Sequence, residues 1–341
     1  MSGLKTDKII SMTVRIVVPL ALTILLLYYL FKKVNFSEMM EIISHGVDYW
    51  WILFAMLLSI VSHIIRAARW RLQLDSLGIR PPFMALCCSI FGCYALNLVF
   101  PRLGEIWRCT YIAKRQKAPM TTVLGSMVSD RLADTLAVAT LLLLTFIIAA
   151  PALEAFLTKY PIGRDMLKLA ADPLTWVSLF GFCGICLLLL WIGRNSRFVG
   201  KLKNWGKELW QGFASVARMK GRGRFILLTF LLWGCYYLQL YVAFFAFPFT
   251  RELCSEPGLA FGLVPCLVAF VLSSIGMAVP SNGGLGPWNI AIMFGLAIYG
   301  ISDAQGTAFS MLQWTGQTVM LVILGIYTMA YIIFSKKNVS R

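Results

Sequence analysis

Charged residues are scarce in this chain of 341 residues, where Asp, Glu, Lys and Arg together occupy only 13% of the positions. Hydrophobic residues account for 59%, well above the share found in water-soluble domains. A soluble globular fold is therefore excluded, and the composition indicates an integral membrane protein. Because the hydrophobic runs are long and continuous, we predict an all-α, polytopic bundle of membrane helices and not a barrel.

The sequence also lacks the motifs that mark many enzymes and metal sites. It contains no nucleophile elbow, Walker loop, HExxH motif or paired Cys/His motif. Its two histidines are isolated, and its nine cysteines fall mainly in apolar runs, where a free thiol behaves as a small hydrophobic side chain. We therefore expect no cofactor, no metal site and no catalytic residue, and the chain is not predicted to be an enzyme.

Acidic residues are few, since 15 Asp and Glu stand against 31 Lys and Arg, for a net charge of +16. The basic residues flank hydrophobic runs, which predicts membrane orientation by the positive-inside rule and no binding of nucleic acid. The segment at residues 194–224 holds nine basic residues and one acid, Glu208. We predict that this basic loop and both termini lie in the cytoplasm.

Five uncharged runs approach or exceed the roughly 20 residues needed to span a bilayer core of about 30 Å. They are residues 16–31, 50–65, 173–193, 225–250 and 304–335. We predict a single membrane domain over residues 1–341, with a first half at about 1–150 and a second half at about 174–335. Each half also contains a hydrophobic stretch that a polar segment with Gly and Pro interrupts, at residues 97–105 and 280–288.

An interrupted helix is unfavourable in lipid unless protein or a wet cavity surrounds its freed backbone groups. The flanks of the first break have about 15 residues each, which is short for full spans. Basic segments at both ends place both ends in the cytoplasm, so the number of membrane crossings between them must be even. A re-entrant hairpin entered from the cytoplasm is favoured, although two short complete helices also give an even number. A second hairpin, entered from outside, is favoured at the second break. The two halves would then form an inverted repeat, as in secondary transporters.

Charged residues gather around the first break and on the helix after it. They are Arg102, Glu105, Arg108, Asp130, Arg131 and Asp134. Each would cost about 2.5–3.5 kcal/mol if it faced lipid, so they are expected to meet inside the bundle. Asp130 and Asp134 share one helical face because they are four residues apart. Two interpretations stay open: a buried ion-pair lock that holds the hairpin, and an anion-binding site.

A surplus of arginine supports the anion-binding interpretation. Arg66, Arg69, Arg71, Arg102, Arg108 and Arg131 outnumber Glu105, Asp130 and Asp134. Guanidinium groups suit phosphate geometry, and the positive end of a helix beside Pro101 would add to the attraction. For the motif at residues 66–71 taken alone, anchoring at the level of the lipid headgroups is the favoured use.

The second break offers small, uncharged polar groups. They are Ser281, Asn282, Gly283, Gly284 and Gly286. Glycine lets a backbone approach a ligand closely or pack tightly against a neighbour, and both uses stay open here. Gln313 and Gln317, four residues apart on the last helix, would either complete this site or bond to carbonyls that the break leaves free.

Four motifs occur in a characteristic order. They are Arg-x-x-Arg-Trp at residues 66–70; Asn97 leading into Pro101-Arg-Leu-Gly-Glu105 and Arg108; Asp130-Arg131 followed by Asp134; and Pro280 leading into Gly283-Gly-Leu-Gly286. Together they resemble the flippase-like family related to the transmembrane region of lysylphosphatidylglycerol synthases, over nearly the whole chain. The resemblance implies a bacterial inner-membrane protein that moves phospholipids or lipid-linked anionic molecules between leaflets.

This chain differs from members of that family at two points. Two-part members of that family have a soluble aminoacyl-transfer domain, which this chain, ending at Arg341, is expected to lack. Members often have an acidic residue soon after the Gly-Gly-Leu-Gly turn, whereas Pro287, Trp288 and Asn289 stand here. A proton-linked role for that acid is therefore not implied for this protein.

The leading interpretation is a lipid translocator whose arginines receive the anionic headgroup of a membrane lipid. A second is a membrane scaffold that docks a lipid-modifying or cell-envelope enzyme through the basic loop at 194–224. A third, less favoured, is a membrane-embedded transferase with Asp130 or Glu105 as base. The sequence leaves open whether the protein forms a homo-oligomer.

Overall fold

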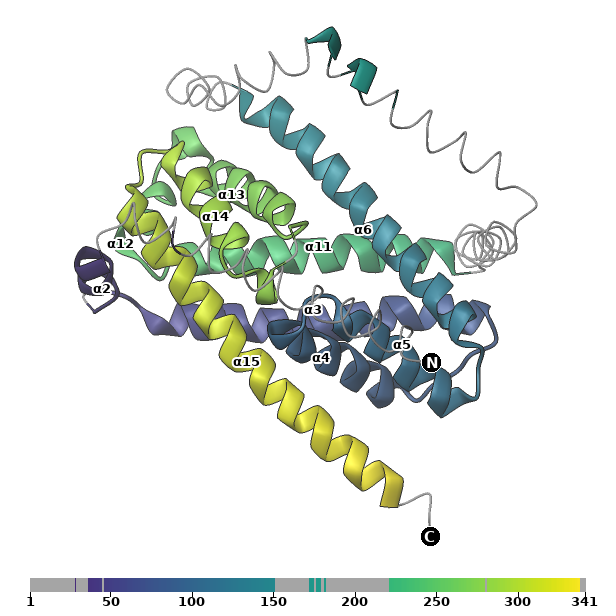
Figure 1. The fold of residues 1–341 in the computed structure, drawn as a ribbon. Helices are drawn as coiled ribbons and strands as arrows, with labels where there is room; N and C mark the ends of the chain where they lie inside the picture. Colours follow the sequence, from purple (N-terminus) through teal and green to yellow (C-terminus); the bar gives the residue numbers. More distant parts are fainter. Residues whose placement is uncertain are drawn as a thin grey trace, which may run out of the picture.

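The computed structural model describes Tyr28 and residues 36–44, 46–150, 172–174, 176–178, 181, 221–279 and 281–337. Every regular element in these residues is helical (Figure 1). Five of the helical segments are long and apolar enough to cross a membrane. They are Tyr49–Ser76, Met120–Ile148, Arg222–Phe244, Pro257–Gly276 and Asp303–Ser335. The prediction of a helical membrane bundle is confirmed.

Several predicted features lie outside the described residues. They are the hydrophobic run at 16–31, most of the run at 173–193, most of the basic loop at 194–224, Pro280 and both ends of the chain. These features stay predictions.

Helix α3 (Tyr49–Ser76) has the residue distribution of a helix in a membrane protein. It begins at Asp48, whose carboxylate accepts a hydrogen bond from the backbone N–H of Trp50 at 3.2 Å. Its polar residues are buried on one face, as Ser59, Ser62, His63, Arg66, Arg69 and Gln73. Its large apolar residues are exposed on the other, as Leu53, Leu57, Val61 and Ile64. Polar groups inside and apolar groups outside are what a lipid environment requires.

Helix α3 packs along α11 (Arg222–Phe244), and α15 (Asp303–Lys337) runs diagonally across the bundle (Figure 1). The C-terminal part of α11, the short helix α12 (Pro248–Leu253) and α15 enclose an aromatic cluster in which Phe244 and Phe247 both contact Phe309. Helix α2 (Phe36–Ser44) packs on α15. This apolar half of the molecule fixes α3, α11 and α15 against one another.

The first predicted break separates α4 (Phe83–Val99) from α5 (Leu103–Gln116), which pack against each other. The break is shorter than the predicted 97–105, because α4 continues past Asn97 to Val99. The Asn97 side chain accepts a hydrogen bond from the backbone N–H of Gly104 at 2.9 Å. A Cβ atom at Gly104 would overlap the carbonyl oxygen of Cys93. Asn97 and Gly104 therefore hold the two helices in close contact.

The second predicted break separates α13 (Leu263–Gly276), which follows the short turn η2 (Pro257–Leu259), from α14 (Pro287–Ala297). The turn η3 (Asn282–Gly284) lies between them. Gly286 has φ +92° and ψ −76°, a conformation that favours glycine. Its N–H donates to the side chain of Asn289 at 3.0 Å. Asn289, one of the three residues that follow the turn where family members often have an acid, thus serves as part of the turn.

The two breaks, far apart in the chain, contact each other. Arg102, with φ +61°, donates from Nη2 to the carbonyl oxygen of Ala278 at 3.0 Å. A Cβ atom at Gly283 would lie 2.6 Å from Leu98 Cδ2. Trp314 of α15 donates from Nε1 to the carbonyl oxygen of Gly283 at 2.9 Å. These contacts pack part of each break against protein, while Val99, Met277 and Val279 stay exposed.

Replacing Gly104 by Ala is expected to destabilise the protein by about 1–3 kcal/mol, because the new methyl group meets backbone that cannot rotate away. Thermal unfolding in detergent measures the effect. Gly234→Ala, within α11 and with no atom within 4 Å of its Cβ position, is the matched control. It is expected to be neutral or stabilising, by up to about 1 kcal/mol. Equal melting temperatures for the two variants would contradict the close contact of α4 and α5.

Candidate functional site

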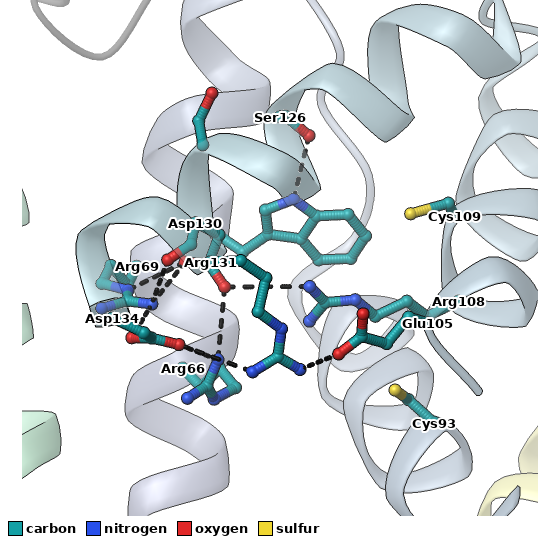
Figure 2. A network of polar contacts seen from close by, with 12 residues as sticks. Arg66, Arg69, Cys93, Glu105, Arg108, Cys109, Ser126, Asp130, Arg131 and Asp134 are labelled. Atoms are coloured by element: carbon teal, nitrogen blue, oxygen red, sulfur yellow. Dashed lines mark hydrogen bonds and ion pairs between the residues drawn. The ribbon is translucent and has the colours of Figure 1, made fainter. Parts of the chain in front are cut away.

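Two arginines of α3 and two aspartates of α6 (Met120–Ile148) form an inner ion-pair core. Asp130 accepts hydrogen bonds from Arg66 Nη1 at 3.3 Å and from Arg69 Nη2 at 2.6 Å. Asp134 accepts from the same nitrogen atoms at 2.9 Å and 2.8 Å. The helical spacings of three and four residues place each pair on one face. Each carboxylate therefore bridges both arginines, in the geometry of a lock between α3 and α6 (Figure 2).

Helix α11 completes the surroundings of the two arginines. Arg66 donates from Nε to the hydroxyl of Tyr236 at 3.1 Å, and Arg69 donates from Nη1 to Thr229 at 3.4 Å. Both arginine side chains are almost fully buried. Anchoring at the lipid headgroups, favoured for this motif from sequence, is therefore wrong for Arg66 and Arg69. Arg71 is half exposed and lies 3.8 Å from Asp75.

Glu105 and Arg108 of α5 and Arg131 of α6 surround this core. Glu105 forms an ion pair with Arg131, which also lies 3.6 Å from Asp134. Arg108 approaches Asp130 from another side, with Nη2 3.8 Å from the carboxylate (Figure 2). The expected meeting of the charged residues inside the bundle is thus observed for all of them except Arg102, which lies at the contact between the breaks.

Arg108 differs from the other arginines of the network. Its side chain is fully buried, yet none of its three nitrogen atoms makes a hydrogen bond within the described residues. The guanidinium carbon lies 4.7 Å from the ring centre of Trp70, whose own Nε1 donates to Ser126 at 3.0 Å. The aromatic face attracts the cation and holds it in place. It leaves the in-plane N–H groups available.

The network carries a surplus positive charge. Arg66, Arg69, Arg108 and Arg131 face Glu105, Asp130 and Asp134, so four cations meet three anions. The inner core is balanced by itself, and the surplus lies in the outer part, which consists of Glu105, Arg108 and Arg131. A buried guanidinium without hydrogen bonds is costly, and a bound anion with several acceptor oxygens would remove that cost.

The uncharged predicted residues lie elsewhere. Asn97 lies near the end of α4, and Pro101 lies in the first break. The second break contains Ser281, Asn282, Gly283, Gly284 and Gly286, and it rests against α4 and Trp314. Gln317 neither joins that turn nor bonds to its carbonyls, since it donates to Ser59 of α3 at 2.9 Å and accepts from Gln239 of α11 at 2.9 Å. Gln313 is buried, and its Oε1 makes no hydrogen bond within the described residues. The predicted site is therefore divided into an ionic part and a neutral part.

Sequence reasoning missed the contributions of α11. Thr229, Tyr236 and Gln239 are seven and three residues apart, so they lie on one face of an otherwise apolar helix. That spacing was the available signal. Sequence reasoning also treated His63 as an isolated residue. In the structure, His63 lies on the buried polar face of α3, and its ring centre lies 4.5 Å from that of Tyr94, on which it stacks.

Comparison with known families identifies a match over most of the chain. The family model described as the lysylphosphatidylglycerol synthase TM region matches residues 16–325, which include both breaks and the whole ionic network. No curated protein and no solved structure matches the chain.

Proposed function

We propose a function for this chain on the basis that it belongs to the family of the lysylphosphatidylglycerol synthase transmembrane region. In this proposal, the protein moves an anionic phospholipid or another anionic lipid-linked molecule between the membrane leaflets. The observation that carries the proposal is Arg108, a buried guanidinium with no hydrogen bond within the described residues. The phosphate of a headgroup would bind its free N–H groups, while the acyl tails stay in lipid.

The divided network supports this assignment. The inner core of Arg66, Arg69, Asp130 and Asp134 acts as the lock that fixes α3 to α6. Arg108 and Arg131, held at its edge by α5, form the binding part. The lock and the anion site are therefore neighbouring parts of one network, and the lock keeps the binding arginines in position.

The two helix pairs fit the same proposal. In it, α4–α5 and α13–α14 are re-entrant hairpins of an inverted repeat, entered from opposite sides of the membrane, and their breaks contact each other through Arg102 and Ala278. Broken helices of this kind line the substrate sites of many transporters. The protein would act as a carrier and not as an enzyme, in the bacterial inner membrane, with both termini in the cytoplasm.

Arg108→Gln is expected to slow lipid translocation at least about tenfold, because one lost charge-assisted hydrogen bond of about 1.5–3 kcal/mol changes an equilibrium by that factor or more. The assay uses proteoliposomes that contain fluorescent phosphatidylglycerol. It follows how fast lipid of the inner leaflet becomes accessible to an impermeant quencher. The fold is expected to persist, because the remaining network has three arginines for three acids.

Arg71→Gln is the matched control, since it removes the same charge from a half-exposed pair outside the network. It is expected to translocate lipid at the wild-type rate. Arg108→Lys keeps the charge without the planar fork, and an intermediate rate is expected. Wild-type translocation by a folded Arg108→Gln protein would refute the proposed binding of the headgroup at this residue.

A further inference from the structure

The buried polar face of α3 extends well beyond the arginines. We use the name polar lane for its six residues, Ser59, Ser62, His63, Arg66, Arg69 and Gln73. Their spacing keeps all six on one side of the helix. With a rise of about 1.5 Å per residue, the 14 steps from Ser59 to Gln73 span about 21 Å. The length of the lane is about two thirds of a hydrocarbon core that is about 30 Å thick.

Polar side chains of other helices face the lane along its length. On α11, Thr229 meets Arg69 and Tyr236 meets Arg66. At the far end, Gln239 of α11 donates to Gln317 of α15, which donates to Ser59. Three transmembrane helices thus place hydrogen-bonding groups on a common line, in an interior where isolated polar groups are unfavourable.

Two members of the lane have hydrogen-bonding groups that are not used. Both ring nitrogens of His63 and both amide atoms of Gln73 are buried and make no hydrogen bond within the described residues. His63 is held by its ring, which stacks on Tyr94 and meets Phe91 edge-on. Such groups in a packed interior call for a reason beyond packing.

The lane joins the two parts of the candidate site. Its arginines belong to the network that holds Arg108, and at its other end Gln317 lies one turn along α15 from Trp314, which bonds to the second break. The charge changes along the way, since the half from His63 to Ser59 is free of arginine. Strong binding at one end and neutral hydrogen-bonding groups beyond it allow an anion to be held and then released.

We infer that the polar lane is the passage along which the anionic headgroup moves between Arg108 and the second break, with His63 lining its middle. This inference rests on the proposed function and specifies the route within the protein. The side chains of the lane would replace the hydration shell of the headgroup, while the apolar outer face of α3 stays in contact with lipid.

His63→Phe tests the lane, because a phenyl ring keeps the stacking on Tyr94 and removes both nitrogens. Translocation of fluorescent phosphatidylglycerol in proteoliposomes is expected to fall at least about tenfold, the effect of losing one hydrogen bond to a charged group. The Kd of the detergent-solubilised protein for short-chain phosphatidylglycerol is expected to stay unchanged, since Arg108 is intact. Gln317→Met, of similar volume, is likewise expected to slow translocation and leave the Kd unchanged. It replaces His63→Phe as the test if that variant does not fold.

Leu57→Met, on the exposed side of α3, is the matched control and is expected to keep the wild-type rate. Wild-type translocation by folded His63→Phe and Gln317→Met proteins would overturn the lane and leave the proposed function standing. A parallel loss of binding and translocation would place these residues in the binding site and also overturn a role in passage alone. Absence of translocation by the wild-type protein would overturn the proposed function and the lane together.

Discussion

Asp130→Asn is expected to destabilise the protein by about 3–5 kcal/mol, the cost of removing one partner from a buried ion pair. The Asp130 carboxylate lies 2.6 Å from Arg69, 3.3 Å from Arg66 and 3.8 Å from Arg108. Without it, the buried network would hold four cations and two anions. Thermal unfolding in detergent, together with the fraction of monodisperse protein, measures the loss.

Asp75→Asn is the control for this variant. Asp75 pairs with Arg71 at 3.8 Å on the exposed side of α3, and both side chains are more than a third exposed. Pairs of this kind contribute up to about 1 kcal/mol. If the two aspartate variants unfolded at the same temperature, Asp130 could not be the centre of a buried lock.

The broken helices could be predicted from sequence because their signals are local. Proline, glycine and small polar residues interrupt apolar runs at both places, and the flanks of the first break and the segment after the second break are short for a span. The boundaries were less accurate, because Asn97 stays helical while its side chain binds Gly104 across the break. That contact depends on how closely α4 and α5 pack.

The meeting of the charged residues could be predicted for a different reason, since lipid tolerates so few of them. This argument places Asp130 and Asp134 near the arginines but does not rank the arginines. Arg102 was grouped with them and instead reaches Ala278, 176 residues along the chain. Arg108 is distinguished by its contact with the ring of Trp70 and by having no hydrogen bond within the described residues, while the neighbouring arginines are paired with acids. Only the packed structure contains that information.

Glu105→Gln is expected to strengthen anion binding, by about tenfold in the Kd for short-chain phosphatidylglycerol, which corresponds to about 1.4 kcal/mol. Glu105 forms an ion pair with Arg131 at the edge of the network. Removing its charge raises the surplus of the network from one positive charge to two and leaves Asp134, at 3.6 Å, as the remaining acidic partner of Arg131. Because both side chains are partly exposed, the effect on stability is expected to stay below about 1 kcal/mol.

The sign of this change separates the two interpretations of the charged cluster. A cluster that serves only as a lock gains nothing when an acid is lost, whereas an anion site gains affinity because a competing carboxylate has gone. Glu252→Gln, at an exposed position of α12, removes the same charge outside the network and is expected to leave the Kd unchanged. A weaker Kd for Glu105→Gln than for the wild-type protein would favour the lock alone. Tighter binding that depends on Arg108 would place the headgroup phosphate between α5 and α6.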